Sequence, residues 1–241
     1  MCTEFWVGWF DHWGNGGHMR GNLEESVRDL DDMLDMGHVN IYMFEGGTNF
    51  GFMNGSNYYD ELTPDVTSYD YDGVLTEDGQ ITEKYRRYRD VVGKYAPLPE
   101  MKFSTEIKRK AYGKLTCQEK VGLFEALSDL SEPVKNTFPI CMEKLDQNYG
   151  YILYRTSLER EQNLEKLRLW GANDRANVFV EEKPVVTLYD RELLSEAEVK
   201  VEFDRPARMD ILMENMGRVN FGPKMESQRK GIDGCVQLNG H

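Results

Sequence analysis

The chain has 241 residues and a formal net charge of −13, with 40% hydrophobic and 29% charged residues. This length and balance indicate an ordered globular protein of one large or two smaller domains, not a disordered chain. The acidic charge argues against nucleic acid as a partner, because the one basic run, Lys108-Arg109-Lys110, is too short to neutralise a phosphate backbone. No apolar stretch approaches about 20 residues, the length that spans a bilayer, so we predict no membrane partner.

The cysteine and histidine spacing argues against metal binding. The chain has four widely spaced cysteines without a CxxC pair: Cys2, Cys117, Cys141 and Cys235. This spacing favours reduced thiols, and with them a cytoplasmic location, over a disulfide frame or a zinc site. The N-terminus shows no charged segment followed by an apolar one, as a secretory signal has. Asp11, His12 and His18 lack a further ligand at suitable spacing, so we expect Asp11 and His12 to form hydrogen bonds.

Residues 3–14, TEFWVGWFDHWG, combine carboxylates with aromatic rings and hold three of the chain's four tryptophans. Aromatic rings stack on the apolar faces of sugars, and a carboxylate can attack or protonate at an anomeric carbon. Glu4 with Trp6 and Trp9 therefore predicts a carbohydrate site. The alternative for the two tryptophans is packing in a core.

Residues 1–95 alternate between strand-like and helix-like patterns. The predicted elements are a helix over 22–36 capped by Asn22, a strand over 39–44, and a helix beginning at Thr82. This order is typical of a parallel α/β unit, in which functional groups lie in the loops after the strands. The loop over 45–80 is long for a plain connection, which predicts a functional role.

The second part of the chain has a different pattern. Residues 96–112, which include two prolines, are predicted to be a linker, and 113–241 to be all-β. The strand candidates are 149–154, 167–170, 176–180, 184–189, 199–203 and 209–213, the third and fourth forming a hairpin. Regular short strands with polar turns predict a β-sandwich or jelly roll.

Four segments, in this order and spacing, resemble the β-galactosidases of glycoside hydrolase family 35. They are TEFWVGWFDHWG at 3–14, VNIYMFEGGTNFG at 39–51, TSYDYD at 67–72 and ENMGRVNFG at 214–222. The resemblance implies an α/β plus all-β fold. Residues 1–95 would supply the last two strand–helix units of a (β/α)₈ barrel, and residues 96–112 would be a linker. Residues 113–241 would form a jelly-roll-like β-sandwich, either as a whole domain or as part of one.

The family removes terminal β-linked galactose with retention of configuration and needs no cofactor or metal. The resemblance implies that Glu4 is the nucleophile, at the end of the seventh barrel strand. The general acid/base belongs to an earlier Asn-Glu motif, which this sequence lacks. We therefore expect a galactoside or oligosaccharide substrate, and little or no hydrolysis by the chain alone. Relatives commonly carry a methionine just before this peptide, so Met1 is interpreted as an internal residue or a fragment boundary.

Three further residues are candidates for substrate binding. Tyr71 resembles a family tyrosine that points at the nucleophile, where a phenol positions a carboxylate and tunes its basicity. Phe221 lies in a loop that reaches over the pocket in relatives, so it is predicted to form an outer wall; simple packing is the alternative. Glu45 departs from the family pattern, and its alternative roles are to act on substrate, to raise the pKa of Glu4, or to face solvent.

Two other functions are compatible with the same residues. One is a non-catalytic carbohydrate-binding or interaction module that uses the aromatic segment without chemistry. The other is one half of a split enzyme, completed by a separately encoded N-terminal half. The DNA upstream of Met1 distinguishes them, since an Asn-Glu segment there supports an enzyme and unrelated sequence supports the module.

Overall fold

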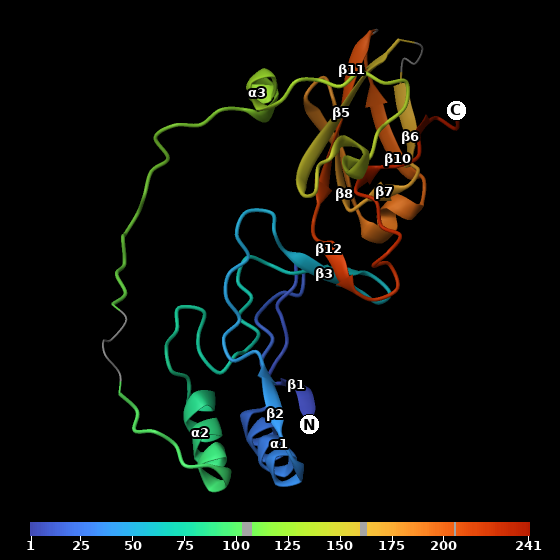
Figure 1. The fold of residues 1–241 in the computed structure, drawn as a ribbon. Coiled ribbons are helices and arrows are strands. Elements are labelled where there is room, and N and C mark those ends of the chain that lie inside the picture. Colours follow the sequence, from blue (N-terminus) through green and yellow to red (C-terminus); the bar gives the residue numbers. More distant parts are fainter. Residues whose placement is uncertain (103–107, 160–162, 205) are drawn as a thin grey trace. The chain divides into compact units, whose positions relative to one another are not determined.

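The computed structural model describes residues 1–102, 108–159, 163–204 and 206–241 (Figure 1). The fold is mixed α/β with mostly β-sheet, as predicted. The chain divides into two compact units, residues 1–54 with 63–113, and residues 55–62 with 114–241. Within the described ranges, no helix is long and apolar enough to cross a membrane. The predicted linker over 96–112 contains residues 103–107, which lie outside the described residues.

The first unit is built on two parallel strands. Strand β1 (Cys2–Trp6) pairs with β2 (Val39–Tyr42), and helix α1 (Leu23–Met36) connects them. Helix α2 (Glu83–Tyr95) follows later in the chain. The two predicted helices and the strand are confirmed, but β2 ends two residues earlier than predicted because the chain turns at residues 43–44.

Both helices begin at capping side chains. The Asn22 Oδ1 atom accepts a hydrogen bond from the Glu25 amide at 3.2 Å, and the Thr82 hydroxyl accepts one from the Tyr85 amide at 3.1 Å. Each cap satisfies a backbone N–H that has no partner within its helix. The buried face of α2 carries Lys84, Tyr88 and Val91, at helical spacing.

Replacing Asn22 by alanine is expected to lower the free energy of unfolding by about 1 kcal/mol, because the Glu25 amide loses its acceptor. Asn22→Asp is the matched control, since it keeps an acceptor and places a negative charge at the positive end of the helix dipole. Urea denaturation of the three proteins measures the difference. An equal loss in both variants would show that the side-chain acceptor at position 22 does not account for the difference in stability.

Strand alternation separates two faces of β1. Phe5 and Val7 are buried in the core of the first unit, where Phe5 packs edge-on against Tyr88 with 6.2 Å between ring centroids. Because successive side chains point to opposite faces of a strand, Glu4 and Trp6 lie on the face turned away from this core. Both are exposed.

Two antiparallel sheets enclose the core of the second unit. One has the strand order β5 (Gly150–Leu158), β11 (Ala207–Asn215), β8 (Arg175–Val180), β9 (Lys183–Tyr189); the other has the order β10 (Ala197–Glu202), β6 (Asn163–Leu169), β14 (Val236–Leu238). Side chains of both sheets share one hydrophobic core, as in a β-sandwich. The predicted hairpin is confirmed, with Glu181 and Glu182 at positive φ in its two-residue turn.

Several short elements were not predicted. Helix α3 (Leu123–Leu130) lies in the region predicted to be all-β, and its apolar residues recur at helical spacing, with Phe124 packed edge-on against Phe179. Further examples are the 3₁₀ helices η1 (Met142–Leu145) and η2 (Asp190–Leu194) and the two-residue strands β7 (Ala172–Asn173) and β13 (Gly231–Ile232).

The loop over 45–80 supplies a strand to the second unit. Strand β3 (Gly55–Tyr58) pairs in parallel with β12 (Arg218–Phe221), and β4 (Leu62–Pro64) follows it. The Leu62 amide donates to Asp190 Oδ2 at 3.1 Å, and the Tyr189 hydroxyl donates to the Leu62 carbonyl at 2.8 Å. Residues 55–62 are therefore an integral part of a unit that otherwise begins at residue 114.

Candidate active site

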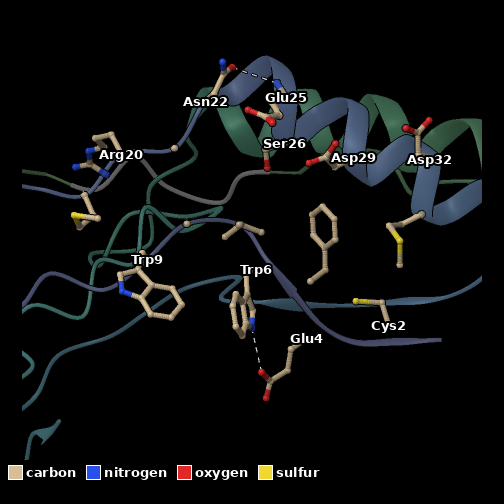
Figure 2. Close-up of a pocket in the computed structure, with 16 residues that line it drawn as sticks. Cys2, Glu4, Trp6, Trp9, Arg20, Asn22, Glu25, Ser26, Asp29 and Asp32 are labelled. Atoms are coloured by element: carbon tan, nitrogen blue, oxygen red, sulfur yellow. Dashed lines mark hydrogen bonds between the residues drawn. The ribbon is translucent and has the colours of Figure 1, made fainter. Parts of the chain in front are cut away.

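Glu4 lies on the uncovered face of β1, next to an indole. The Trp6 Nε1 atom donates a hydrogen bond to Glu4 Oε2 at 3.1 Å (Figure 2). The two residues are two positions apart, so they project from the same face of the strand. Trp6 is 56% exposed, which leaves much of its ring surface accessible beside the carboxylate.

An aromatic cluster continues from this pair towards Tyr71. The Trp6 and Trp9 centroids are 5.3 Å apart, and those of Trp9 and Tyr71 are 6.2 Å apart. Tyr71 is buried, with Tyr42 at 5.2 Å and Tyr69 at 5.4 Å. Burial also raises the pKa of Tyr69, so its phenol stays neutral. The structure thus brings Trp6, Trp9 and Tyr71 into one cluster, in which Trp6 is the exposed member.

A pocket of about 730 Å³ opens between β1 and α1. Figure 2 shows Ser26, Asp29 and Asp32 on the helix wall, whereas the Glu4 and Trp6 side chains project from β1 on the side away from the helix. The side chains of Glu4 and Trp6 and the helix wall of this pocket therefore lie on opposite sides of β1 (Figure 2).

Tyr71 lies in a loop fixed by charged contacts on either side of it. The Arg20 Nη1 atom donates to Asp70 Oδ1 at 2.7 Å and to Asp72 Oδ1 at 2.9 Å. The Asp72 amide donates to Asp70 Oδ1 at 3.0 Å. Asp70 therefore has the contacts of a structural residue in the loop around Tyr71.

Sequence reasoning missed the buried cation of this region, Lys84. Its ammonium donates to the Val7 carbonyl at 2.7 Å, to Asp72 Oδ2 at 2.7 Å and to the Asp72 carbonyl. A signal was present, because Lys84 lies in the first turn of a helix, where the helix dipole disfavours a cation that has no anionic partner.

Asp11 forms hydrogen bonds within the loop that follows β1. The Asp11 carboxylate is hydrogen-bonded to His18 Nδ1 at 2.6 Å and accepts a hydrogen bond from the Met19 amide at 2.6 Å. The His12 Nδ1 atom lies 3.3 Å from the Trp13 carbonyl oxygen. Across the residues that the structure describes, no group of three or more His, Cys, Asp or Glu side chains is arranged to hold a metal ion.

Glu45 and Phe221 are the two remaining candidates for substrate binding. Glu45 is half-buried, three residues after the end of β2. Phe221 ends β12 in the second unit, where it is 55% exposed and packs against Tyr59 at 5.7 Å between centroids. Their roles beside a sugar stay predictions.

Comparison with known proteins matches both parts of the chain. The model of glycosyl hydrolases family 35 matches residues 1–95, and that of the beta-galactosidase first all-beta domain matches residues 139–241. Beta-galactosidase-1-like protein 2 of Homo sapiens is 39% identical over 99% of this chain and 37% of its own length. Beta-galactosidase of Xanthomonas manihotis is 35% identical over 99% of this chain and 40% of its own length, and that of Homo sapiens 38% identical over 91% and 32%.

These matches support an enzyme of the glycoside hydrolase type. Residues 1–95 are thus similar to glycosyl hydrolases family 35, and residues 139–241 are similar to the first all-beta domain of beta-galactosidases. The chain spans two fifths or less of the length of the three relatives described above.

Proposed function

We propose that the chain supplies the nucleophile of a retaining exo-β-galactosidase, and that this nucleophile is Glu4. The observation that carries the proposal is the Glu4 carboxylate on the uncovered face of β1, hydrogen-bonded by the exposed Trp6 indole. Relatives named beta-galactosidase, at 35–38% identity, support a galactoside as substrate. The parallel β1–α1–β2 arrangement supports the further proposal that residues 1–95 are part of a (β/α)₈ barrel.

In this mechanism a Glu4 oxygen attacks the anomeric carbon, a carbon–oxygen bond forms, and the bond to the leaving group breaks. A second carboxyl protonates the departing oxygen and then activates the water that hydrolyses the galactosyl-enzyme. A retaining site needs this carboxyl at roughly 5–5.5 Å from the nucleophile. The Asn-Glu motif that provides it in the family has no counterpart in residues 1–241, so we propose that this second carboxyl is not supplied by these residues.

A substrate that needs no acid tests the nucleophile directly. The probe is a dinitrophenyl β-galactoside whose 2-hydroxyl is replaced by fluorine, which slows hydrolysis of the ester. Glu4 would displace dinitrophenolate, which leaves with the electron pair as a stable anion and takes up no proton. We expect mass spectrometry of the digested chain to find a fluorogalactosyl ester on Glu4, absent from Glu4→Gln. Glu25→Gln, a pocket residue on α1, is the matched control and should label normally.

The outcomes separate the alternative functions. Galactose binding without an ester on Glu4 would support the carbohydrate-binding module, and the exposed Trp6 ring is the observation that favours this alternative. Ester formation without turnover of an ordinary β-galactoside is the expected result, and it fits both a fragment and one half of a split enzyme. Robust turnover by the chain, lost in Glu4→Gln, would overturn the proposal that the acid is missing.

A further inference from the structure

Lys84 is a buried cation at a position that disfavours a positive charge. It is 7% exposed and lies in the first turn of α2, near the positive end of the helix dipole. An ammonium has three N–H donors, and the three acceptors of Lys84 match that number: the Val7 carbonyl, the Asp72 carbonyl and Asp72 Oδ2. These contacts are the ones that offset the cost of burying the charge.

The acceptors belong to two segments that carry proposed site residues. Val7 directly follows β1, three residues after Glu4, and its amide continues the pairing with β2 by donating to the Tyr42 carbonyl at 3.0 Å. Asp72 directly follows Tyr71. One ammonium therefore joins the strand of Glu4 to the loop of Tyr71.

The joined segments lie in direct contact. A Cβ atom at Gly8 would lie 2.1 Å from the Tyr71 carbonyl oxygen and 2.8 Å from the Asp72 Cβ, so only glycine fits this approach. Tyr71 and Asp72 have φ of 58° and 52°, a left-handed conformation that costs non-glycine residues of order 1–3 kcal/mol each. Such a loop keeps its shape only while its surroundings hold it.

We propose that Lys84 is a positioning residue: it sets the place of the Tyr71 ring relative to the strand that carries Glu4, without touching the substrate. The inference rests on the proposed function of Glu4. Arg20 holds the same loop from its exposed side, whereas Lys84 joins the loop by hydrogen bonds to Val7, directly after β1. A merely stabilising lysine would change the stability of the fold but not the reactivity of the folded chain.

The test compares Lys84→Met with Lys94→Met. Lys94 lies on the same helix, but its ion pair with Asp31 is at the surface, with 57% of the lysine side chain exposed. The measurement is the rate constant of Glu4 esterification at saturating fluorogalactoside, with the fraction of folded protein measured in parallel. We expect Lys84→Met to lower this rate constant about 10- to 100-fold, as small misplacements of reacting groups do, and Lys94→Met to leave it unchanged.

A second variant and a second measurement test the same proposal if Lys84→Met does not fold. Asp72→Asn leaves both carbonyl acceptors of Lys84 in place but removes the negative charge beside it, so it should lower the rate constant in the same direction but less. Fluorine NMR of fluorotryptophan-labelled chain reports the Trp9 ring, which touches Tyr71. Its resonance should shift in Lys84→Met and Asp72→Asn, but not in Lys94→Met.

The results separate the two proposals. If the unmodified chain forms no ester on Glu4, the proposed function fails, and the Trp9 resonance alone then decides the positioning role. If the unmodified chain is labelled and folded Lys84→Met is labelled at the same rate, the positioning role is wrong while the nucleophile assignment stands. An unshifted Trp9 resonance in both loop variants also overturns the positioning role.

Discussion

Replacing Lys230 by methionine is expected to lower the free energy of unfolding of the second unit by about 3–5 kcal/mol, because it leaves a buried carboxylate without its counter-charge. Lys230 is fully buried, and its ammonium donates to Asp174 Oδ1 at 2.8 Å, Asp174 Oδ2 at 2.6 Å and the Gly217 carbonyl at 2.8 Å. Asp174 also accepts from the Met216 amide at 2.9 Å. Loss of the lysine would release both the carboxylate and the 215–217 turn.

Burial disfavours the charged forms of both Asp174 and Lys230. It raises the pKa of the Asp174 carboxyl and lowers the pKa of the Lys230 ammonium. The charged pair therefore depends on its mutual contacts, and removing one partner costs more than the pair itself contributes.

Urea unfolding of matched variants checks this expectation. Lys166→Met is the control, because Lys166 pairs with Glu196 at 3.0 Å at the surface and exposed pairs contribute about 0–1 kcal/mol. Adding Asp174→Asn to Lys230→Met removes the unpaired carboxylate charge. The double variant should therefore recover a large part of the free energy of unfolding that Lys230→Met loses. Equal losses for the two single lysine variants would contradict the importance of the buried pair.

Local patterns in the sequence predicted the elements that depend on neighbours along the chain. Asn22 and Thr82 cap their helices as their side-chain chemistry requires, and the strands on either side of Glu181 and Glu182 form the expected hairpin. Glu4 and Trp6 fall on one strand face for the same local reason, the two-residue period of a strand.

Long-range contacts explain what the sequence could not predict. The buried Lys230 follows a polar run, and its partner Asp174 is 56 residues away, so nothing local distinguishes it from a surface lysine. Lys84 meets Val7 across 77 residues. Strand β3 has a polar sequence, GSNY, and becomes a strand because β12 offers it a parallel partner.

This dependence of β3 on a distant partner makes Gly222 a sensitive position. We expect Gly222→Ala to lower the free energy of unfolding of the second unit by about 3 kcal/mol or more, from a backbone clash and a strained φ together. A Cβ atom there would lie 1.8 Å from the Tyr58 carbonyl oxygen at the end of β3, and Gly222 has φ of +114°. The clash is with backbone, so no side-chain rotation relieves it.

Gly240→Ala separates the clash from the strain. Gly240 also has a positive φ, +86°, but no atom lies within 4 Å of the position of an added Cβ, so the expected loss is only about 1–2 kcal/mol. Limited proteolysis adds a local measurement, because displacement of β3 from β12 should expose residues 55–62 to cleavage in Gly222→Ala and not in Gly240→Ala. If the two variants unfold at the same denaturant concentration and are cleaved alike, β3 does not depend on its contact with Gly222. If only Gly222→Ala is destabilised and cleaved, residues 55–62 are held by the second unit although the sequence places them within the first.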